Sequence, residues 1–262
     1  MKIAISGKGG VGKTTIASAL IKSFAETHQT VYAIDGDPDA CLAAALGIPA
    51  AVSSQIKPVV EMGDKIRSVS GGGAFYTLNP SIDDRVIDEF AYKHGNIRFM
   101  RMGDVKKGGS QCYCRENTFL QALISALLLD KGEVVVMDMG AGIEHLSRGT
   151  ARGVDIMLVV VEPGRNSVNT AMNVKKMADD LGIGLIRVVA NKIRSEKERE
   201  FIEKSFQPGE VLGFISFNND IWENSMEPDS AGTAGELLDG MREVREKILG
   251  EVGGYKRSEG GG

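Results

Sequence analysis

Residues 2–14 read KIAISGKGGVGKT. The run Lys2–Ser6 is short and mostly apolar, as in a buried strand, and residues 13–26 repeat apolar side chains at helical spacing. Between them, residues 7–14 match the pattern G-x-x-x-x-G-K-[ST]. A glycine loop that joins a strand to a helix is typical of a phosphate-binding loop, so this stretch predicts an α/β fold that binds a nucleotide.

Each residue type in this loop has a chemical reason to be there. The glycines let backbone N–H groups curl around phosphate oxygens, a geometry that a side chain would block. The helix that begins near Lys13 points its positive end at the anion. Lys13 is expected to reach the β- and γ-phosphates, and the Thr14 hydroxyl to bind Mg²⁺. We therefore predict that the nucleotide is bound by Gly7, Gly9, Gly10, Val11, Gly12, Lys13, Thr14 and Thr15.

Short strands and helices alternate along the rest of the chain. Apolar, β-branched runs lie at 31–34, 134–137, 156–161, 185–190 and 211–215. Helical periods lie at 117–129, 166–181, 196–204 and 234–250. This alternation predicts an α/β fold of the P-loop NTPase type, with a mainly parallel central sheet and helices on both faces.

The predicted domain organisation is simple. We expect a single P-loop ATPase domain over residues 1–252. The segment 50–110 is rich in glycine and charge, and we interpret it as an insertion between two halves of that domain rather than as a second domain. Residues 253–262 are polar and Gly-rich, and we expect a flexible tail there.

Composition limits the function classes. The chain has 262 residues, 42% of them hydrophobic, which is enough for a sizeable core. The net charge of −4, without a basic block, does not favour non-specific nucleic-acid binding. No apolar run approaches the roughly 20 residues that cross a bilayer, and the first residues lead directly into a strand, so we expect no signal peptide. Three cysteines do not make a disulfide framework, and a reducing, cytoplasmic location is expected.

Carboxylates follow two of the predicted strands. VYAIDGDPD at 31–39 places Asp35 and Asp37 at a strand end beside the phosphate loop, where open α/β sheets bind their ligands. VVVMDMG at 134–140 places Asp138 at the end of another strand, in the Walker B arrangement. We therefore predict that Asp138 holds Mg²⁺ through water, together with Thr14.

The phosphate loop carries an additional lysine, Lys8, which a generic loop of this kind does not need. With it, KGGVGKTT resembles the deviant Walker A loop of the MinD/ParA/nitrogenase-iron-protein class of dimeric ATPases. In that class the extra lysine crosses a nucleotide-sandwich dimer to the partner's phosphates, as an arginine finger does. The resemblance implies catalytic roles for Lys8, Lys13 and Asp37, with Asp37 orienting the attacking water. A solvated surface lysine is the alternative for Lys8.

The identity of the base depends on Asn191, in VVANKI at a strand end. In the class, the matching asparagine hydrogen-bonds adenine, and a turn-forming asparagine is the alternative. A guanine reader would usually show N-K-x-D, whereas this sequence has NKIR and lacks that acid. ATP is therefore favoured over GTP.

Two of the three cysteines, Cys112 and Cys114, lie one residue apart in GGSQCYCREN. In an extended segment both sulfurs face the same way and can reach one ion. Two thiolates are half of a tetrahedral site, and a face-to-face dimer would supply the other half. Soft thiolates suit Zn²⁺, and also Ni²⁺ in a flatter site. A redox pair, or two ordinary small residues, remain open from the spacing, and Cys41 is expected to be a buried small residue.

The chain also resembles a narrower family, the CooC nickel-insertion ATPases that mature carbon monoxide dehydrogenase. The resemblance covers most of residues 1–220 through GKGGVGKTT, DGDPDACL, RMGDVKKGGSQCYCRENTFL, VVVMDMGAGIEHLSRGTA and VEPGRNS. It implies an ATP- and Mg²⁺-dependent homodimer in which Cys112 and Cys114 bind Ni²⁺ or Zn²⁺ at the interface. The implied partner is a nickel enzyme, either carbon monoxide dehydrogenase or acetyl-CoA synthase, and the sequence does not separate these two clients.

Two other function classes compete with this one. A positioning ATPase that binds membrane or DNA should show a basic amphipathic C-terminus or a basic face, whereas residues 234–250 form a mixed-charge helical pattern. An electron-transfer protein with a bridging iron–sulfur cluster would take its two cysteines from separate segments rather than from C-x-C. The sequence therefore favours nickel insertion, with no nucleic-acid or membrane partner.

Overall fold

The computed structural model of the protein describes residues 1–37, 39–70, 82–103, 114–127, 133–140, 146, 151, 153–224 and 235–259. Side chains are described for these residues except 84, 114–118, 224 and 256–259.

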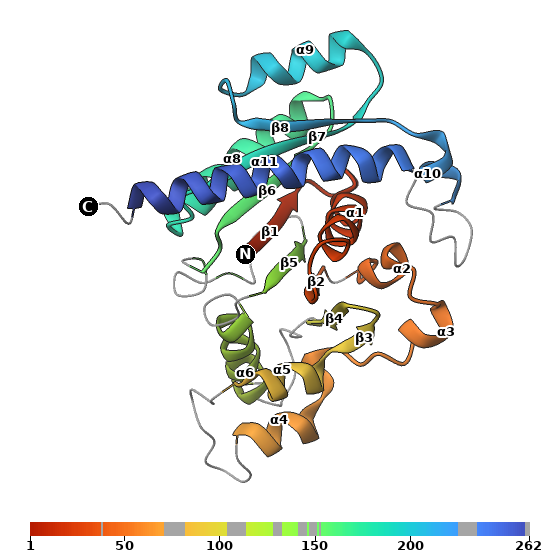
Figure 1. The fold of residues 1–262 in the computed structure, drawn as a ribbon, viewed down its shortest axis with the longest axis vertical. Coiled ribbons are helices and arrows are strands. Elements are labelled where there is room, and N and C mark those ends of the chain that lie inside the picture. The colour runs from red at the N-terminus through yellow and green to blue at the C-terminus, as the bar shows by residue number, and fades with distance from the viewer. Residues whose placement is uncertain are drawn as a thin grey trace.

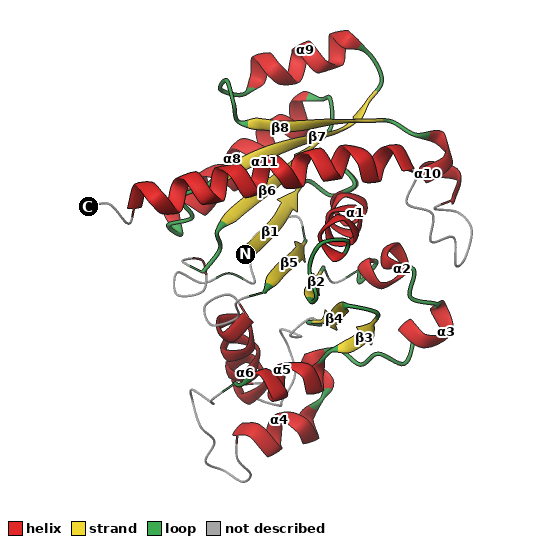
Figure 2. Ribbon diagram, viewed as in Figure 1, coloured by secondary structure: helices red, strands yellow, loops and turns green. Residues whose placement is uncertain are grey.

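Within these ranges the strands form one eight-stranded sheet, in the order β3-β4-β2-β5-β1-β6-β7-β8 (Figure 2). In chain order the strands are β1 (Lys2–Gly7), β2 (Val31–Gly36), β3 (Tyr92–His94), β4 (Ile97–Arg101), β5 (Val134–Met139), β6 (Ile156–Val161), β7 (Ile186–Ile193) and β8 (Val211–Ser216). Only the β3–β4 pair is antiparallel within this sheet. The carboxyl ends of the parallel strands therefore share one edge of the sheet, which is where such folds bind ligands.

Helices cover both faces of the sheet, and Figure 1 shows α1 and α11 in front of it with α8 behind. The described helical segments are α1 (Lys13–Ala25), α2 (Leu42–Leu46), α3 (Ala50–Ser53), η1 (Val59–Glu61), α4 (Gly63–Ser70), α5 (Asp84–Phe90), α6 (Cys114–Ser125), α8 (Arg165–Asp180), α9 (Glu196–Ser205), α10 (Asn219–Asn224) and α11 (Gly235–Glu259). Among the described residues, no helix has both the length and the apolar character needed to span a membrane.

The central strands are apolar over most of their length because both faces of the sheet are buried. Successive residues of β1 show this alternation. Ile3 and Ile5 belong to the core under α1 and α11, whereas Ala4 belongs to the opposite core, which α6 and α8 cover. The side chains of β1, β2, β5 and β6 are all buried. The predicted α/β fold with a mainly parallel sheet is confirmed.

The segment 50–110 differs from the expectation, because it adds two strands, β3 and β4, to one edge of the sheet. Sequence analysis assigned no strand there. The reason is visible in β4, IRFMR, where Arg98 and Arg101 interrupt the apolar run that marks a fully buried strand. β4 nevertheless pairs with β2 in parallel, so this part of the segment belongs to the central sheet.

The C-terminal end also differs from the expectation. Helix α11 continues to Glu259 and therefore includes most of the segment 253–262, which the sequence predicted to be a flexible tail. Val252 on this helix is buried. Tyr255 packs so closely on Gly184 that a Cβ atom there would clash with the phenol. These apolar and aromatic contacts explain why the helix runs through a Gly-rich sequence.

Candidate functional site

The phosphate loop joins the carboxyl end of β1 to the start of α1. Gly10 and Gly12 adopt left-handed φ angles of 81° and 92°, which glycine accepts without strain. Gly12 is the N-cap of α1, and no side chain caps the helix there. The first turn of α1 also contains no acidic residue. The positive end of α1 is therefore open to an anionic ligand, as the sequence predicted.

Lys13 is buried at the start of α1, and its ammonium folds back over the loop. Its Nζ donates to the carbonyl oxygen of Lys8 at 3.4 Å, a long hydrogen bond that a phosphate oxygen could replace. The structure thus brings the two predicted lysines together at the loop. Lys8 itself is half-buried.

Two carboxyl groups face each other at the ends of β2 and β5. Asp35 and Asp138 are register partners, and both side chains are fully buried. Asp35 accepts hydrogen bonds from the amide of Asp37 at 3.3 Å and from the amide of Leu42 at 3.2 Å. These bonds fix the start of the loop after β2. Burial still raises the pKa of Asp35 to about 6.

Asp138 has fewer hydrogen-bond partners than Asp35. Neither of its oxygens has a well-formed hydrogen bond to a described residue. Burial raises the pKa of Asp138 to about 7, and the neighbouring Thr14 hydroxyl and the Lys13 ammonium only partly oppose this rise. A buried carboxylate without partners is costly, and a hard cation with oxygen ligands would relieve that cost. Thr14 and Asp138 therefore fit the Mg²⁺ site that the sequence predicted.

Asp37 lies in the tight loop that follows β2. Its Oδ1 accepts a hydrogen bond from the amide of Asp39 at 3.1 Å, and Ala40 adopts a left-handed φ of 49° at the end of this turn. The backbone amide of Met102 donates to the backbone carbonyl of Asp35 at 2.8 Å, so the chain that follows β4 is attached to the end of β2. The turn holds Asp37 half-exposed at the edge where the phosphate loop lies.

The end of β7 contacts the phosphate loop directly. Asn191 is buried, and its Nδ2 donates to the carbonyl oxygen of Val11 at 2.9 Å. Lys192 donates to the carbonyl oxygen of Gly10 at 2.5 Å and pairs with Glu162 at 3.2 Å. Sequence analysis identified Asn191 but missed Lys192 and Glu162. The adjacent N-K pair at a strand end was the signal that could have found the lysine.

The cysteines are only partly within the described residues. Cys112 lies outside them, and Cys114 begins α6 but its side chain is not described. Cys41, expected to be buried, is instead exposed because it follows the acidic turn and precedes the short helix α2. Partial burial and the nearby carboxylates raise the pKa of its thiol. In the part of the chain that the structure describes, no group of three or more His, Cys, Asp or Glu side chains could hold a metal ion.

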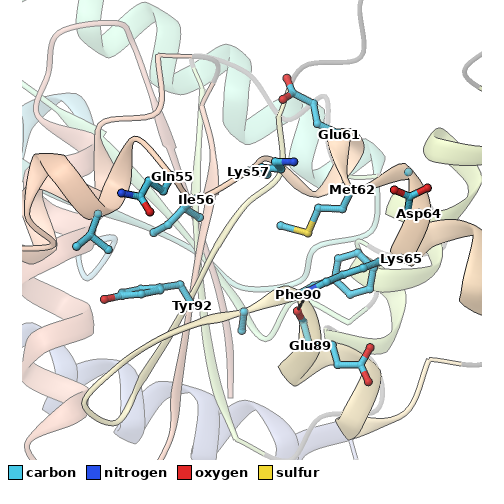
Figure 3. A pocket seen from close by; sticks show the side chains of 13 residues that line it. Gln55, Ile56, Lys57, Glu61, Met62, Asp64, Lys65, Glu89, Phe90 and Tyr92 are labelled. Atoms are coloured by element: carbon cyan, nitrogen blue, oxygen red, sulfur yellow. Dashed lines mark hydrogen bonds between the residues drawn. The ribbon is translucent and has the colours of Figure 1, made fainter.

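A cavity of about 480 Å³ lies away from the phosphate loop, between the chain around η1 and the start of β3. Figure 3 shows Lys65 lying along Phe90 at one side, with Ile56 and Tyr92 at the other. The Lys65 ammonium is 5.6 Å from the centre of the Phe90 ring. The predicted nucleotide-binding residues do not line this cavity, so it is separate from the candidate site.

Comparison with known proteins agrees with this geometry. The family model for the CobQ/CobB/MinD/ParA nucleotide binding domain, CbiA, matches residues 2–230. An uncharacterised ATP-binding protein of Methanocaldococcus jannaschii is 41% identical over 84% of this chain and 87% of its own length. The carbon monoxide dehydrogenase accessory protein CooC of Rhodospirillum rubrum is 40% identical over 84% of this chain and 85% of its own length.

Solved structures give the same fold. MinD in the MinC:MinD cell division complex of Aquifex aeolicus superposes with a TM-score of 0.64 at 20% identity, covering 95% of both chains. A ParA family ATPase of Chlorobium tepidum superposes with a TM-score of 0.65 at 15% identity, covering 95% of this chain and 97% of its own. At these identities the likeness concerns the fold alone.

Proposed function

Because the chain belongs to the CobQ/CobB/MinD/ParA family of nucleotide-binding proteins, we propose that it is an ATPase that inserts nickel into a nickel enzyme. The observation that carries the proposal is the 40% identity to a carbon monoxide dehydrogenase accessory protein, over more than four-fifths of both chains. Carbon monoxide dehydrogenase is therefore the first candidate client, and acetyl-CoA synthase is the second. A cytoplasmic location is part of the proposal.

The nucleotide half of the mechanism uses the phosphate loop. The N–H groups of the loop and of the α1 N-terminus bind the phosphates, and Lys13 leaves the Lys8 carbonyl to contact them. Thr14 and Asp138 would hold Mg²⁺, which neutralises charge on the phosphates. Asp37 orients the attacking water from the loop after β2.

Recognition of adenine is assigned to Asn191. Its amide nitrogen already donates one N–H to the Val11 carbonyl, which leaves the amide oxygen and the second N–H for a base. That oxygen is an acceptor and complements the amino group of adenine. The preference for ATP over GTP comes from the sequence, where NKIR lacks the acid of the N-K-x-D guanine motif.

Nickel enters this scheme as cargo. Binding of ATP closes two subunits, which brings each Lys8 to the partner's phosphates and places two C-x-C pairs together. Cys112 and Cys114 of both subunits then supply four thiolates to one ion. Hydrolysis loosens the dimer and releases the ion to the client. Since metal and nucleotide both favour the dimer, each should tighten binding of the other.

The first test is the size and metal content of the reduced protein. Light scattering and metal analysis are done with and without Ni²⁺ on the unmodified chain and on the double variant Cys112→Ser/Cys114→Ser. We expect a nickel-induced dimer with one ion for two chains, and loss of both in the variant. Cys41→Ser removes an exposed thiol outside the motif and is the matched control. A monomer that ignores nickel, or equal loss in the control, would contradict the C-x-C assignment.

A positioning ATPase is the second candidate, since MinD and ParA proteins share the fold. Such a protein would present a basic helix or face to a membrane or to DNA. On α11, however, Arg242 pairs with Glu26, the C-cap residue of α1, and therefore attaches the helix to the rest of the domain. Co-sedimentation with anionic vesicles and with DNA distinguishes the two candidates, because a nickel-insertion ATPase should bind neither.

A further inference from the structure

We propose that Lys192 is a positioning residue that, with Asn191 and Glu162, holds the phosphate loop in its binding conformation. We call these three residues the loop clamp. The inference rests on the proposed nucleotide site but is independent of nickel, of the dimer and of the client.

The clamp holds two successive carbonyl groups of the phosphate loop. Lys192 Nζ donates to the Gly10 carbonyl at 2.5 Å, and Asn191 Nδ2 donates to the Val11 carbonyl at 2.9 Å. The side-chain amide of Asn191 also lies directly against Gly12. A Cβ atom added to Gly12 would clash with Nδ2 of Asn191. Three consecutive loop residues are thus in contact with two consecutive residues of β7.

A regular strand could not make these contacts. Consecutive side chains of a strand point to opposite faces of the sheet, so Asn191 and Lys192 should diverge. Lys192 instead adopts a left-handed φ of 60°, and the pairing of β7 with β8 becomes irregular between Ala190 and Ile193. This irregularity turns both side chains to the same loop. A lysine in a left-handed conformation is uncommon, and such outliers persist where surrounding contacts hold them.

The held carbonyls orient the groups that bind phosphate. In a trans peptide, the carbonyl of one residue and the N–H of the next point in opposite directions. Holding the carbonyls of Gly10 and Val11 toward β7 therefore turns the N–H groups of Val11 and Gly12 away from it. In the glycine loop these N–H groups are among the donors predicted to surround the phosphates. The clamp removes backbone freedom that nucleotide binding would otherwise have to restrict.

Glu162 completes the clamp from the neighbouring strand. Its Oε2 lies 3.2 Å from Lys192 Nζ, and its own amide is bonded to the buried Ser167 hydroxyl at 3.0 Å. Glu162 and Ser167 both belong to the VEPGRNS stretch at the end of β6. Since the sheet order is β1-β6-β7, the clamp connects the ends of three adjacent strands. The position of the loop thus depends on the sheet and not only on its own glycines.

The test measures nucleotide affinity by calorimetry, for ADP and for ATP with Mg²⁺. We expect Lys192→Ala to raise the dissociation constants of both nucleotides about tenfold or more, with a parallel rise in KM and a smaller change in kcat. Lys192→Arg keeps a cation that can donate to Gly10 and pair with Glu162, so it should stay within about threefold of the unmodified protein.

Lys175→Ala is the matched control for a purely structural ion pair. The Lys175–Glu210 pair is at least as buried, with side chains 20% and 22% exposed against 37% and 32% for Lys192 and Glu162, and it joins α8 to the residue before β8. We expect this variant to lose stability but to keep its nucleotide affinity. Equal affinity in Lys192→Ala and Lys175→Ala, or no rescue by arginine, would overturn the clamp. Neither result would bear on nickel binding, which the cysteine variants test separately.

Discussion

Asp35 and Asp138 face each other across β2 and β5, and both carboxyl groups are fully buried. The two differ in what surrounds them. Asp35 has two backbone donors, whereas Asp138 has no well-formed hydrogen bond to a described residue. The pair thus combines a carboxylate that shapes the loop after β2 with one that is left for a ligand. This difference leads to the first prediction.

Asp138→Asn should stabilise the protein in the absence of nucleotide and Mg²⁺. The raised pKa of Asp138 means that the folded chain keeps a proton that the unfolded chain has lost, between about pH 4 and pH 7. Stability therefore falls as the pH rises through this window. We expect the variant to gain roughly 1–3 kcal/mol in unfolding free energy at pH 8 and little at pH 4.

Urea unfolding in the presence of a chelator, at both pH values, measures this effect. Asp180→Asn removes an exposed carboxyl of α8 and should change nothing. Asp138→Asn should also lose Mg²⁺-dependent nucleotide binding, so stability and function change in opposite directions. A gain that is equal at pH 4 and pH 8 would show that the buried charge is not its cause.

Three glycines of the phosphate loop form a graded series. Gly9 has space for a Cβ atom, Gly10 has space but a left-handed φ, and Gly12 has a left-handed φ and a clash with Asn191. We expect alanine to change the unfolding free energy by less than about 0.5 kcal/mol at Gly9, to cost about 1 kcal/mol at Gly10, and to cost more than about 2 kcal/mol at Gly12. Thermal and urea unfolding of the three variants give the order, and any other order would contradict the described loop geometry.

Lys8→Ala separates hydrolysis from binding. If Lys8 acts across a dimer, its loss should lower kcat by ~10³ or more, while ATP affinity changes only a few-fold. Lys13→Ala is the contrasting variant, because it should lose nucleotide affinity as well. Single-turnover hydrolysis and equilibrium binding provide the two readouts. Normal hydrolysis by the Lys8 variant would rule out the dimeric mechanism.

Gly184 and Gly250 test the C-terminal end of α11. Alanine at Gly184 would clash with Tyr255, and we expect a loss of about 1–2 kcal/mol in stability. Alanine at Gly250 meets open space on an exposed helical position, and we expect a gain of about 0.5–1 kcal/mol from helix propensity. Chemical denaturation of both variants measures these changes in unfolding free energy. A neutral Gly250→Ala would indicate that this part of the chain is not helical in solution.

Burial and residue type decided which strands could be predicted from the sequence. β1, β2, β5 and β6 were predicted because both of their faces are buried, which leaves near-continuous apolar runs. β3 and β4 were missed because arginines interrupt β4 and because β3 is a three-residue edge strand. Buried strands at the centre of a sheet are therefore visible in the sequence, and its edges are much less so.

Site residues divide in the same way. The phosphate loop and the acids Asp35 and Asp138 could be predicted as site residues because they follow strands at fixed spacing. Lys192 and Glu162 were missed because their contact is long-range and requires a left-handed lysine, which no periodic pattern indicates. Cys41 was assigned to the interior on residue type alone, whereas the acidic turn before it holds it at the surface.

The backbone hydrogen bond between Met102 and Asp35 also limits how far the segment after Met102 can reach from the end of β2. Met102 is joined to the end of β2, and Cys112 follows it by ten residues. Since an extended chain advances at most ~3.3–3.6 Å per residue, ten residues can reach no more than about 36 Å from Met102. The proposed metal-binding motif is therefore joined to the proposed nucleotide site by a short length of chain. While the bond between Met102 and Asp35 persists, the proposed cargo ion cannot travel beyond this reach within its own subunit.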